Sequence, residues 1–372
     1  MIHCPTRSSE QGEGTRRGPK DATIGPMVAR HLPSPLFAAI GGVFAALKAL
    51  LLLFDLFPAP VKPARWLSGA PRRHRRVEAS PAGPVVTDCW YPGAPWRGRR
   101  PAIVIAMGVR TARHDRPVIG RFAASLARIG FVVCWPRLVV LDRGRPGIER
   151  PDTFIRAIDQ LSADPQVDPR RIAMLGFSVG GSTALIAAAD PRIADRVRAV
   201  IFFGGFYDAF DFFVEAAAGV PTAEGALWRP SLGAMEHLLT VIAALRARGI
   251  LRMFPSSSQD EARAILAAAP EHEQAVLRSL NPATIVRDLQ APVFILHDVQ
   301  DQMVHYSESL KLAKALGAER VAALAIVDLF EHVQPRAALS LASLRDLVRL
   351  ARFVVLAIAY LEGSGSIRSG KR

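Results

Sequence analysis

The sequence AMLGFSVGG, residues 173–181, decides the fold. Its apolar start predicts a buried strand, and the residues from Gly180 to Ala189 predict a helix, so the serine lies where a strand turns directly into a helix. Such a turn strains the backbone of Ser178, exposes its hydroxyl, and leaves room only for glycine at the flanking positions. The amide of Val179 and the helix dipole can then stabilise an oxyanion. We therefore predict Ser178 as a nucleophile.

Strands and helices alternate on both sides of this motif, from about residue 76 to residue 362. This alternation is typical of a doubly wound, mostly parallel sheet with helices on both faces. It is interrupted at 209–285, where helical periods predict a cap insertion, and it ends in a long helix expected from about Pro335 to Glu362. The predicted strands are Val85–Trp90, Pro101–Met107, Phe131–Trp135, Arg171–Leu175, Val197–Phe203, Pro292–Leu296 and Val321–Asp328.

A serine hydroxyl is inert at neutral pH unless a positioned base takes its proton, so a histidine held by a carboxylate is required. In this architecture the chain order is serine, acid, histidine. Asp301 and His332 fit that order, because each comes just after a strand, at the sheet edge where ligands bind. Asp298 and Asp208 stay open as alternative acids.

The second oxyanion donor is expected in the turn after the strand Pro101–Met107. Gly108 there lets the backbone approach a substrate, and the amide of Val109 is the predicted donor.

The N-terminal region has a different character. Residues 1–30 are polar and basic and predict a disordered tail, residues 31–58 a membrane-spanning or membrane-anchoring helix, and residues 59–75 a basic Pro/Arg linker. The apolar run within 36–57 has the length of a span, although it contains Lys48. A helix lying on a bilayer or packed on the protein is the alternative. A start at Met27 instead of Met1 would make this segment resemble a signal anchor.

Composition excludes several classes of protein. The 372 residues are 50% hydrophobic, which excludes a disordered or collagen-like chain. Net charge is +14, but residues 1–100 hold 15 Lys/Arg and 6 Asp/Glu, so +9 of it belongs to this N-terminal stretch and no nucleic-acid partner is expected. Cys4, Cys89 and Cys134 are far apart, which predicts buried or free thiols and no metal site.

Three segments, in the expected order, resemble the α/β-hydrolase superfamily. They are VDPRRIAMLGFSVGG (167–181), NPATIVRDLQAPVFILHDVQDQMV (281–304) and LFEHV (329–333). The similarity is to its dienelactone-hydrolase and prolyl-oligopeptidase side, over about residues 76–362. It implies an eight-stranded sheet, a Ser178–His332–Asp301 triad and an acyl-enzyme mechanism that uses no cofactor or metal. Dienelactone-specific members use cysteine as the nucleophile, so Ser178 favours an ordinary esterase.

The family's usual His-Gly after the third strand is replaced by Met107-Gly108, and its His-Gly before the acid loop by His297-Asp298.

Taken together, the motifs predict a serine hydrolase that cleaves a carboxylic ester with a hydrophobic acyl group. Alternatives are an acyltransferase or peptidase on the same triad, and a non-catalytic, membrane-anchored interaction protein. The N-terminal helix predicts membrane association, and a chain without it would be cytoplasmic.

Overall fold

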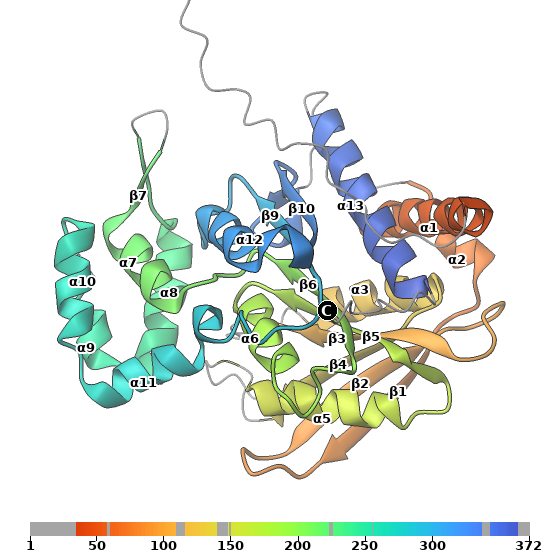
Figure 1. The fold of residues 1–372 in the computed structure, drawn as a ribbon, viewed down its shortest axis with the longest axis horizontal. Helices are drawn as coiled ribbons and strands as arrows, with labels where there is room; N and C mark the ends of the chain where they lie inside the picture. Colours follow the sequence, from red (N-terminus) through yellow and green to blue (C-terminus); the bar gives the residue numbers. More distant parts are fainter. Residues whose placement is uncertain are drawn as a thin grey trace, which may run out of the picture.

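The computed structural model describes residues 35–57, 60–108, 116–139, 148, 150–222, 226–254, 256–336 and 343–363. An eight-stranded sheet lies at its centre (Figure 1), in the order β1-β2-β4-β3-β5-β6-β9-β10. β1 and β2 are antiparallel to their neighbours, and the other neighbouring strands are parallel. The predicted α/β fold with a mostly parallel sheet of about eight strands is confirmed. The strands are β1 (Arg72–Glu78), β2 (Val85–Tyr91), β3 (Arg100–Ala106), β4 (Val132–Leu138), β5 (Val167–Phe177), β6 (Val197–Phe203), β9 (Val293–Asp298) and β10 (Val321–Val327).

Helices cover both faces of the sheet. On one face lie α3 (Arg116–Arg128) and α13 (Leu344–Glu362), and on the other α5 (Pro151–Ser162), α6 (Val179–Ala188) and α12 (Ser307–Arg320). The central strands consist of continuous apolar runs, since side chains on both faces of each strand are buried under helices. The final helix begins at Leu344 and not near Pro335, because Gln334 and Pro335 belong to a short strand.

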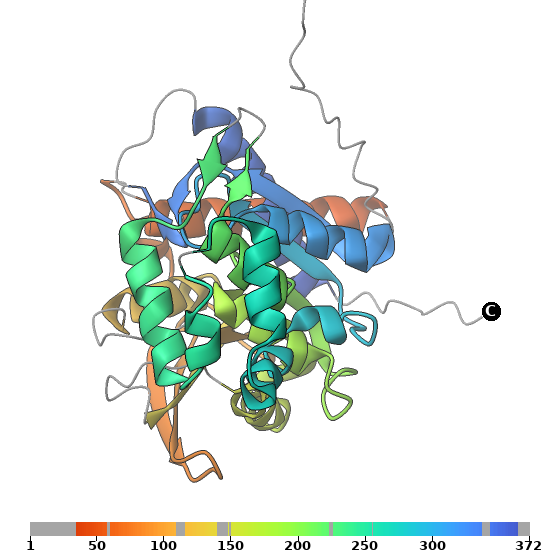
Figure 2. The ribbon, with the colours of Figure 1, turned by 90° about the vertical axis from the view of Figure 1, so that its left-hand side faces the viewer.

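The helical insertion between β6 and β9 forms a cap with its own core. Figure 2 views the molecule from this side, with the cap helices toward the reader. They are α7 (Ala209–Ala218), α8 (Leu232–Ala244), α9 (Arg248–Leu251), α10 (Gln259–Ala267) and α11 (Glu271–Ser279), joined by a short hairpin of β7 (Val220–Pro221) and β8 (Leu227–Trp228). The ammonium of Lys311 in α12 binds Glu215 of α7 at 2.6 Å and Glu308 at 2.7 Å, which ties the cap to the body.

The apolar N-terminal run forms α1 (Pro35–Leu56), followed by the short α2 (Ala64–Leu67). α1 lies beside α13 at the opposite side of the molecule from the cap (Figure 1). Its Lys48 is buried, forms an ion pair with Glu362 and lies 4.3 Å from the ring centroid of Trp96. Burial lowers the pKa of Lys48, although Glu362 opposes that shift.

Within the described part of the chain, no helix meets the length and hydropathy needed to cross a bilayer, so the predicted membrane span is not supported. The expected linker 59–75 instead contains α2 and the start of β1, an exposed edge strand. Two arginines of this segment hold β1 against β2, a role that the basic composition of the segment does not indicate. Arg73 and Arg75 bind the buried Asp88 of β2 at 2.9 and 2.8 Å. Disordered tails are predicted for residues 1–30 and 363–372, and all of these residues except Gly363, which follows α13, lie outside the described residues.

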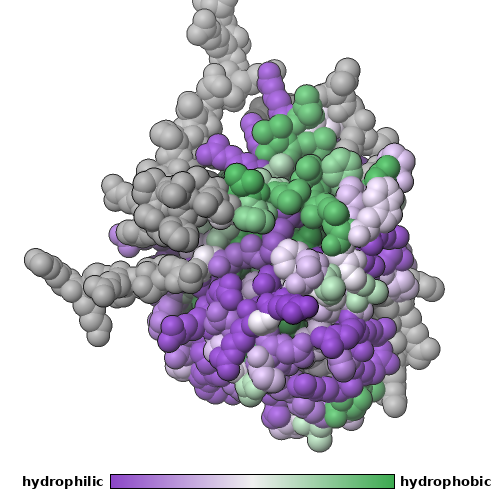
Figure 3. All heavy atoms as spheres, turned by 90° about the vertical axis from the view of Figure 1, so that its right-hand side faces the viewer, coloured by the Kyte–Doolittle hydropathy of each residue, from purple (hydrophilic) through white to green (hydrophobic). Residues whose placement is uncertain are grey.

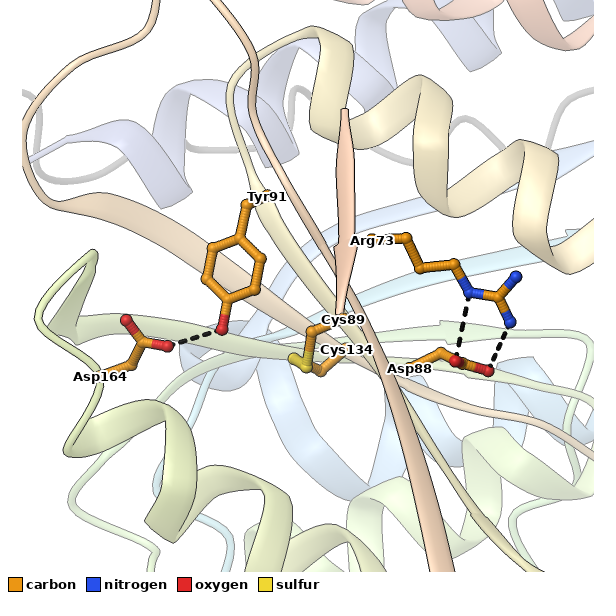
Figure 4. Close-up of a disulfide and its surroundings, with 6 residues drawn as sticks. All are labelled: Arg73, Asp88, Cys89, Tyr91, Cys134 and Asp164. Carbon is orange, nitrogen blue, oxygen red and sulfur yellow. Dashed lines mark hydrogen bonds and ion pairs between the residues drawn. A yellow bond between two sulfur atoms is a disulfide. The ribbon is translucent and has the colours of Figure 1, made fainter. Parts of the chain in front are cut away.

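The expectation of free thiols is wrong for two of the three cysteines. Cys89 and Cys134 form a disulfide between β2 and β4 (Figure 4). The two residues are directly paired in the antiparallel register of these strands, which places their side chains on the same face of the sheet. Cys4 lies outside the described residues.

Candidate active site

The predicted nucleophile lies at the sharp turn between β5 and α6. Ser178 has φ 55°, a left-handed backbone conformation that residues other than glycine rarely adopt. Its amide donates to the carbonyl of Phe203 at the end of β6, 2.8 Å away, and its carbonyl accepts from Gly181 at 2.7 Å. These bonds hold the strained residue in place.

The glycines around Ser178 are required by close backbone contacts. A Cβ at Gly180 would lie 2.2 Å from the carbonyl oxygen of Ala106, and one at Gly176 would lie 2.4 Å from that of Gly180. A Cβ at Gly108 would lie 3.2 Å from Ser178 Oγ. The loop after β3 therefore passes directly beside the serine, as the sequence predicts. Val109, the predicted second oxyanion donor, lies outside the described residues.

His332 is held in a tight turn between the short strands β11 (Phe330–Glu331) and β12 (Gln334–Pro335). Its φ is 56°, so the backbone is strained here as at Ser178. Imidazole Nδ1 lies 2.7 Å from Asp301 Oδ2. Because Nδ1 donates to this carboxylate in the neutral ring, Nε2 carries a free lone pair. Nε2 is buried and has no hydrogen-bond partner among the described residues.

Asp301 is fixed by a dense set of donors. Its Oδ1 accepts from the amides of Met303 at 2.8 Å and Val304 at 3.1 Å. Burial alone would raise the pKa of Asp301, but the charge of His332 and hydrogen bonds from His297 and His332 outweigh it. The pKa of Asp301 is therefore well below its usual range, and this carboxylate is ionised.

The two other candidate acids have different partners. Asp298 Oδ2 accepts from the amides of Leu329 and Phe330, both at 2.7 Å, and so anchors the loop that carries His332. Burial raises the pKa of Asp298 in spite of these bonds. Asp208 caps α7 by accepting from Phe210 at 2.8 Å. The structure thus brings Asp301, and not Asp298 or Asp208, to the imidazole.

Ser178, Val179 and His332 all line one cavity of about 620 Å³. Most of the other lining side chains are apolar, and they come from the cap, from α3 and α13 and, unexpectedly, from α1. The sequence does not indicate this part of the site, because an apolar run such as that of α1 predicts a membrane segment. The signal that could have pointed to it is Lys48, a charge that needs a protein partner when it is buried.

Known proteins share parts of this arrangement. Residues 150–334, which include Ser178, Asp301 and His332, match the model of the X-Pro dipeptidyl-peptidase (S15) family. The chain is similar to the hydrolyase poxO of Penicillium oxalicum, 39% identical over 79 residues, which are 21% of this chain and 18% of that protein. The hydrolase acrC of Aspergillus aculeatus is 42% identical over 71 residues, or 18% of this chain and 16% of that protein. The matched segments span less than a fifth of these curated relatives.

A solved structure extends the likeness beyond the matched segments. The crystal structure of a puromycin hydrolase superposes with a TM-score of 0.50 at 15% identity, over 81% of this chain and 40% of that one. Such a likeness shows the fold alone. Together with the strand order and the strained serine between β5 and α6, it leads to one assignment. The chain has the α/β-hydrolase fold, and the segment that holds Ser178, Asp301 and His332 matches the X-Pro dipeptidyl-peptidase (S15) family model.

Proposed function

We propose that the protein is a serine hydrolase that forms an acyl-enzyme on Ser178. The observation that carries this proposal is the buried Nε2 of His332, which has no hydrogen-bond partner in the part of the chain that the structure describes and belongs to a residue lining the same cavity as Ser178. A buried nitrogen without a partner costs free energy, so it is a functional feature when it faces a nucleophile's cavity.

In the proposed reaction, Ser178 Oγ attacks the substrate carbonyl while His332 Nε2 takes the hydroxyl proton. Asp301 holds the imidazole through Nδ1 and stabilises the imidazolium. The amides of Val179 and Val109 receive the oxyanion. His332 returns the proton to the leaving amine or alcohol, and water then releases the acyl group by the same steps.

An amide is the first candidate for the bond that is cleaved, because the matched family model describes peptidases. A carboxylic ester is the second candidate, favoured by the apolar lining of the cavity. A 4-nitroanilide and a 4-nitrophenyl ester with the same acyl group separate the two. A kcat/KM for the anilide within about tenfold of that for the ester supports an amidase, because esters are intrinsically the easier substrates. An added acceptor alcohol that captures the acyl group would instead identify an acyltransferase.

A fluorophosphonate probe tests the proposal itself. Labelling of the wild-type protein that is lost in Ser178→Ala supports a serine hydrolase. Folded wild-type protein that resists labelling overturns it and favours an interaction protein that keeps the serine turn as structure. His332→Ala is the matched variant, since it leaves the serine in place but removes the base.

We also propose that the outer face of α1 contacts a lipid surface. Val43, Phe44, Leu47 and Leu50 are about half exposed or more, and their spacing places them on one face of the helix. Figure 3 shows apolar side chains gathered on this side of the molecule. The basic excess of the N-terminal hundred residues favours anionic head groups.

Co-sedimentation of the full chain with anionic and zwitterionic vesicles tests this contact. We expect binding to anionic vesicles that Phe44→Glu weakens and that Val77→Glu, at an exposed position on β1, leaves unchanged. Equal binding of both variants, or none by the wild type, overturns the proposed contact.

A further inference from the structure

The cavity beside Ser178 and His332 extends well beyond the space that a scissile bond needs. It has a volume of about 620 Å³ and reaches from the cap residues Leu238 and Val241 to Leu53 and Leu56 of α1. Protein interiors are close-packed, and an apolar cavity of about 150 Å³ already binds benzene. A cavity four times larger, lined mainly by apolar side chains, is typical of a site for a large apolar group.

α1 and the serine share one wall of this cavity. The ring centroids of Phe57 and Phe330 are 6.0 Å apart, those of Phe330 and Phe203 are 5.0 Å apart, and those of Phe203 and Phe177 are 5.7 Å apart. Phe177 directly precedes Ser178, so a continuous row of rings leads from the end of α1 to the nucleophile. A substrate held against this row of rings would contact both the end of α1 and Ser178.

The one carboxylate in the described lining does not favour a cationic substrate. Asp55 at the end of α1 is the one carboxylate among the described lining residues. It accepts a hydrogen bond from Ser125 and pairs with Arg65 at 3.3 Å. Because this carboxylate already has two partners, the cavity offers no ready site for the free ammonium of a dipeptide.

α1 is held firmly enough to act as a fixed wall. Lys48 pairs with Glu362 at the end of α13. The ammonium of Lys62 donates to the carbonyls of Phe54 at 2.8 Å, Asp55 at 3.1 Å and Phe57 at 2.9 Å, which caps the C-terminus of the helix. Leu53 and Leu56 are thereby placed against the cavity.

We propose that Leu53 and Leu56 of α1 determine substrate size, and that the site takes an extended apolar acyl group whose far part packs against these two leucines. This inference rests on the proposed function, since it assumes that Ser178 is acylated. It predicts that changes in α1 alter chain-length preference without altering the chemistry at the serine.

Leu53→Trp tests the proposal with 4-nitrophenyl esters from acetyl to dodecanoyl. We expect kcat/KM for the longest esters to fall about tenfold or more relative to wild type, while the acetyl ester changes less than about twofold. Ala46→Trp is the matched control, because Ala46 lies on the same helix but is exposed and outside the cavity lining. It should leave the whole series unchanged.

Leu53→Ala keeps the test valid if the tryptophan variant does not fold. This variant enlarges the cavity, so the preferred chain should become longer. Identical chain-length profiles for wild type and for the Leu53 variants would overturn the role of α1. Fluorophosphonate labelling separates this result from failure of the proposed function: an unlabelled wild type removes both proposals, whereas labelled proteins with unchanged profiles remove only this one.

Discussion

The segment 150–334 and the N-terminal segment 35–108 contribute to the same cavity in different ways. The first holds Ser178, Asp301 and His332 in turns where backbone strain and close contacts leave little choice of residue. The second contributes the apolar side chains of Leu53 and Leu56 on α1 and of Phe57 just after it, where no strained backbone restricts the choice of residue. Reactive groups therefore depend on local backbone geometry, while the binding walls depend on which surfaces the fold brings together.

The largest expected effect contrasts Asp298, the last residue of β9, with Asp301, which follows the strand. Asp301→Asn should lower kcat/KM by about 10³–10⁴-fold, because the amide would favour the wrong tautomer of His332. Asp298→Asn should cost about 1–3 kcal/mol of unfolding free energy, because it loses hydrogen bonds to the loop before His332, and should reduce activity much less. Ester hydrolysis measures kcat/KM of both variants, and urea denaturation measures their unfolding free energies. Equal losses of activity would contradict the assignment of Asp301.

The pH dependence of stability gives an independent check on Asp301. Its pKa is lower in the folded protein than the usual value near 3.9, so its stabilising contribution is fully present above about pH 4. It is lost as the pH falls further, through the folded-state pKa. Urea denaturation between pH 3 and 6 should show a steeper decline for wild type than for Asp301→Asn. Parallel curves would show that Asp301 has no such charge interaction.

The next effect tests the backbone contacts of the serine turn. Gly180→Ala should destabilise the fold by about 3 kcal/mol and abolish probe labelling, because the new methyl group would meet the backbone of Ala106 and Met107. Gly233→Ala is the matched control, since Gly233 is on α8 and nothing lies within 4 Å of its would-be Cβ. It should be neutral or slightly stabilising. Thermal denaturation compares the two, and a neutral Gly180→Ala would contradict the close approach of the two backbones.

Removing the disulfide should separate stability from activity. Cys89→Ala with Cys134→Ala should lower the free energy of unfolding by about 2–4 kcal/mol, because the bond restricts the unfolded chain over a separation of 45 residues. Neither cysteine lines the cavity, so kcat/KM should be unchanged. Denaturation of wild-type protein with and without a reductant provides the same comparison. A selective loss of activity would show that β2 and β4 influence the site.

The smallest expected effect concerns the cap of α1. Lys62→Met should cost about 1 kcal/mol, because three carbonyls at the end of the helix lose their donor. Hydrogen exchange of residues 52–57 should become faster. Lys314→Met, at an exposed position on α12, is the control and should not change exchange there. Unchanged protection of 52–57 in Lys62→Met would show that the wall is held by other contacts.

The sequence predicts much of the fold, because its strands are continuous apolar runs and its nucleophile lies in a motif tied to one backbone geometry. The residues predicted as Val197–Phe203 are the bounds of β6, and most other strands differ by one to four residues at an end. The choice between Asp298 and Asp301 could not be made from order alone. Asp298 ends β9 and Asp301 follows three residues later, and their hydrogen-bond partners separate them.

The remaining features depend on partners distant in the chain. Lys48 and Glu362 are 314 residues apart, so the apolar helix around Lys48 carries no local sign that it packs on protein. By sequence alone, the basic residues Arg73 and Arg75 suggest a linker, but in the structure they form ion pairs with Asp88 of the adjacent strand. The pairing of Cys89 with Cys134 likewise follows from strand register, which spacing does not give.

The contact between α1 and α13 has a consequence for biosynthesis. The first described helix of the polypeptide meets the last one, and both line the chamber beside Ser178. On a ribosome, α13 emerges after all the other described elements, so the chamber can close only once α13 has been synthesised. A nascent chain would therefore contain Ser178 and His332 before the apolar chamber beside them is complete.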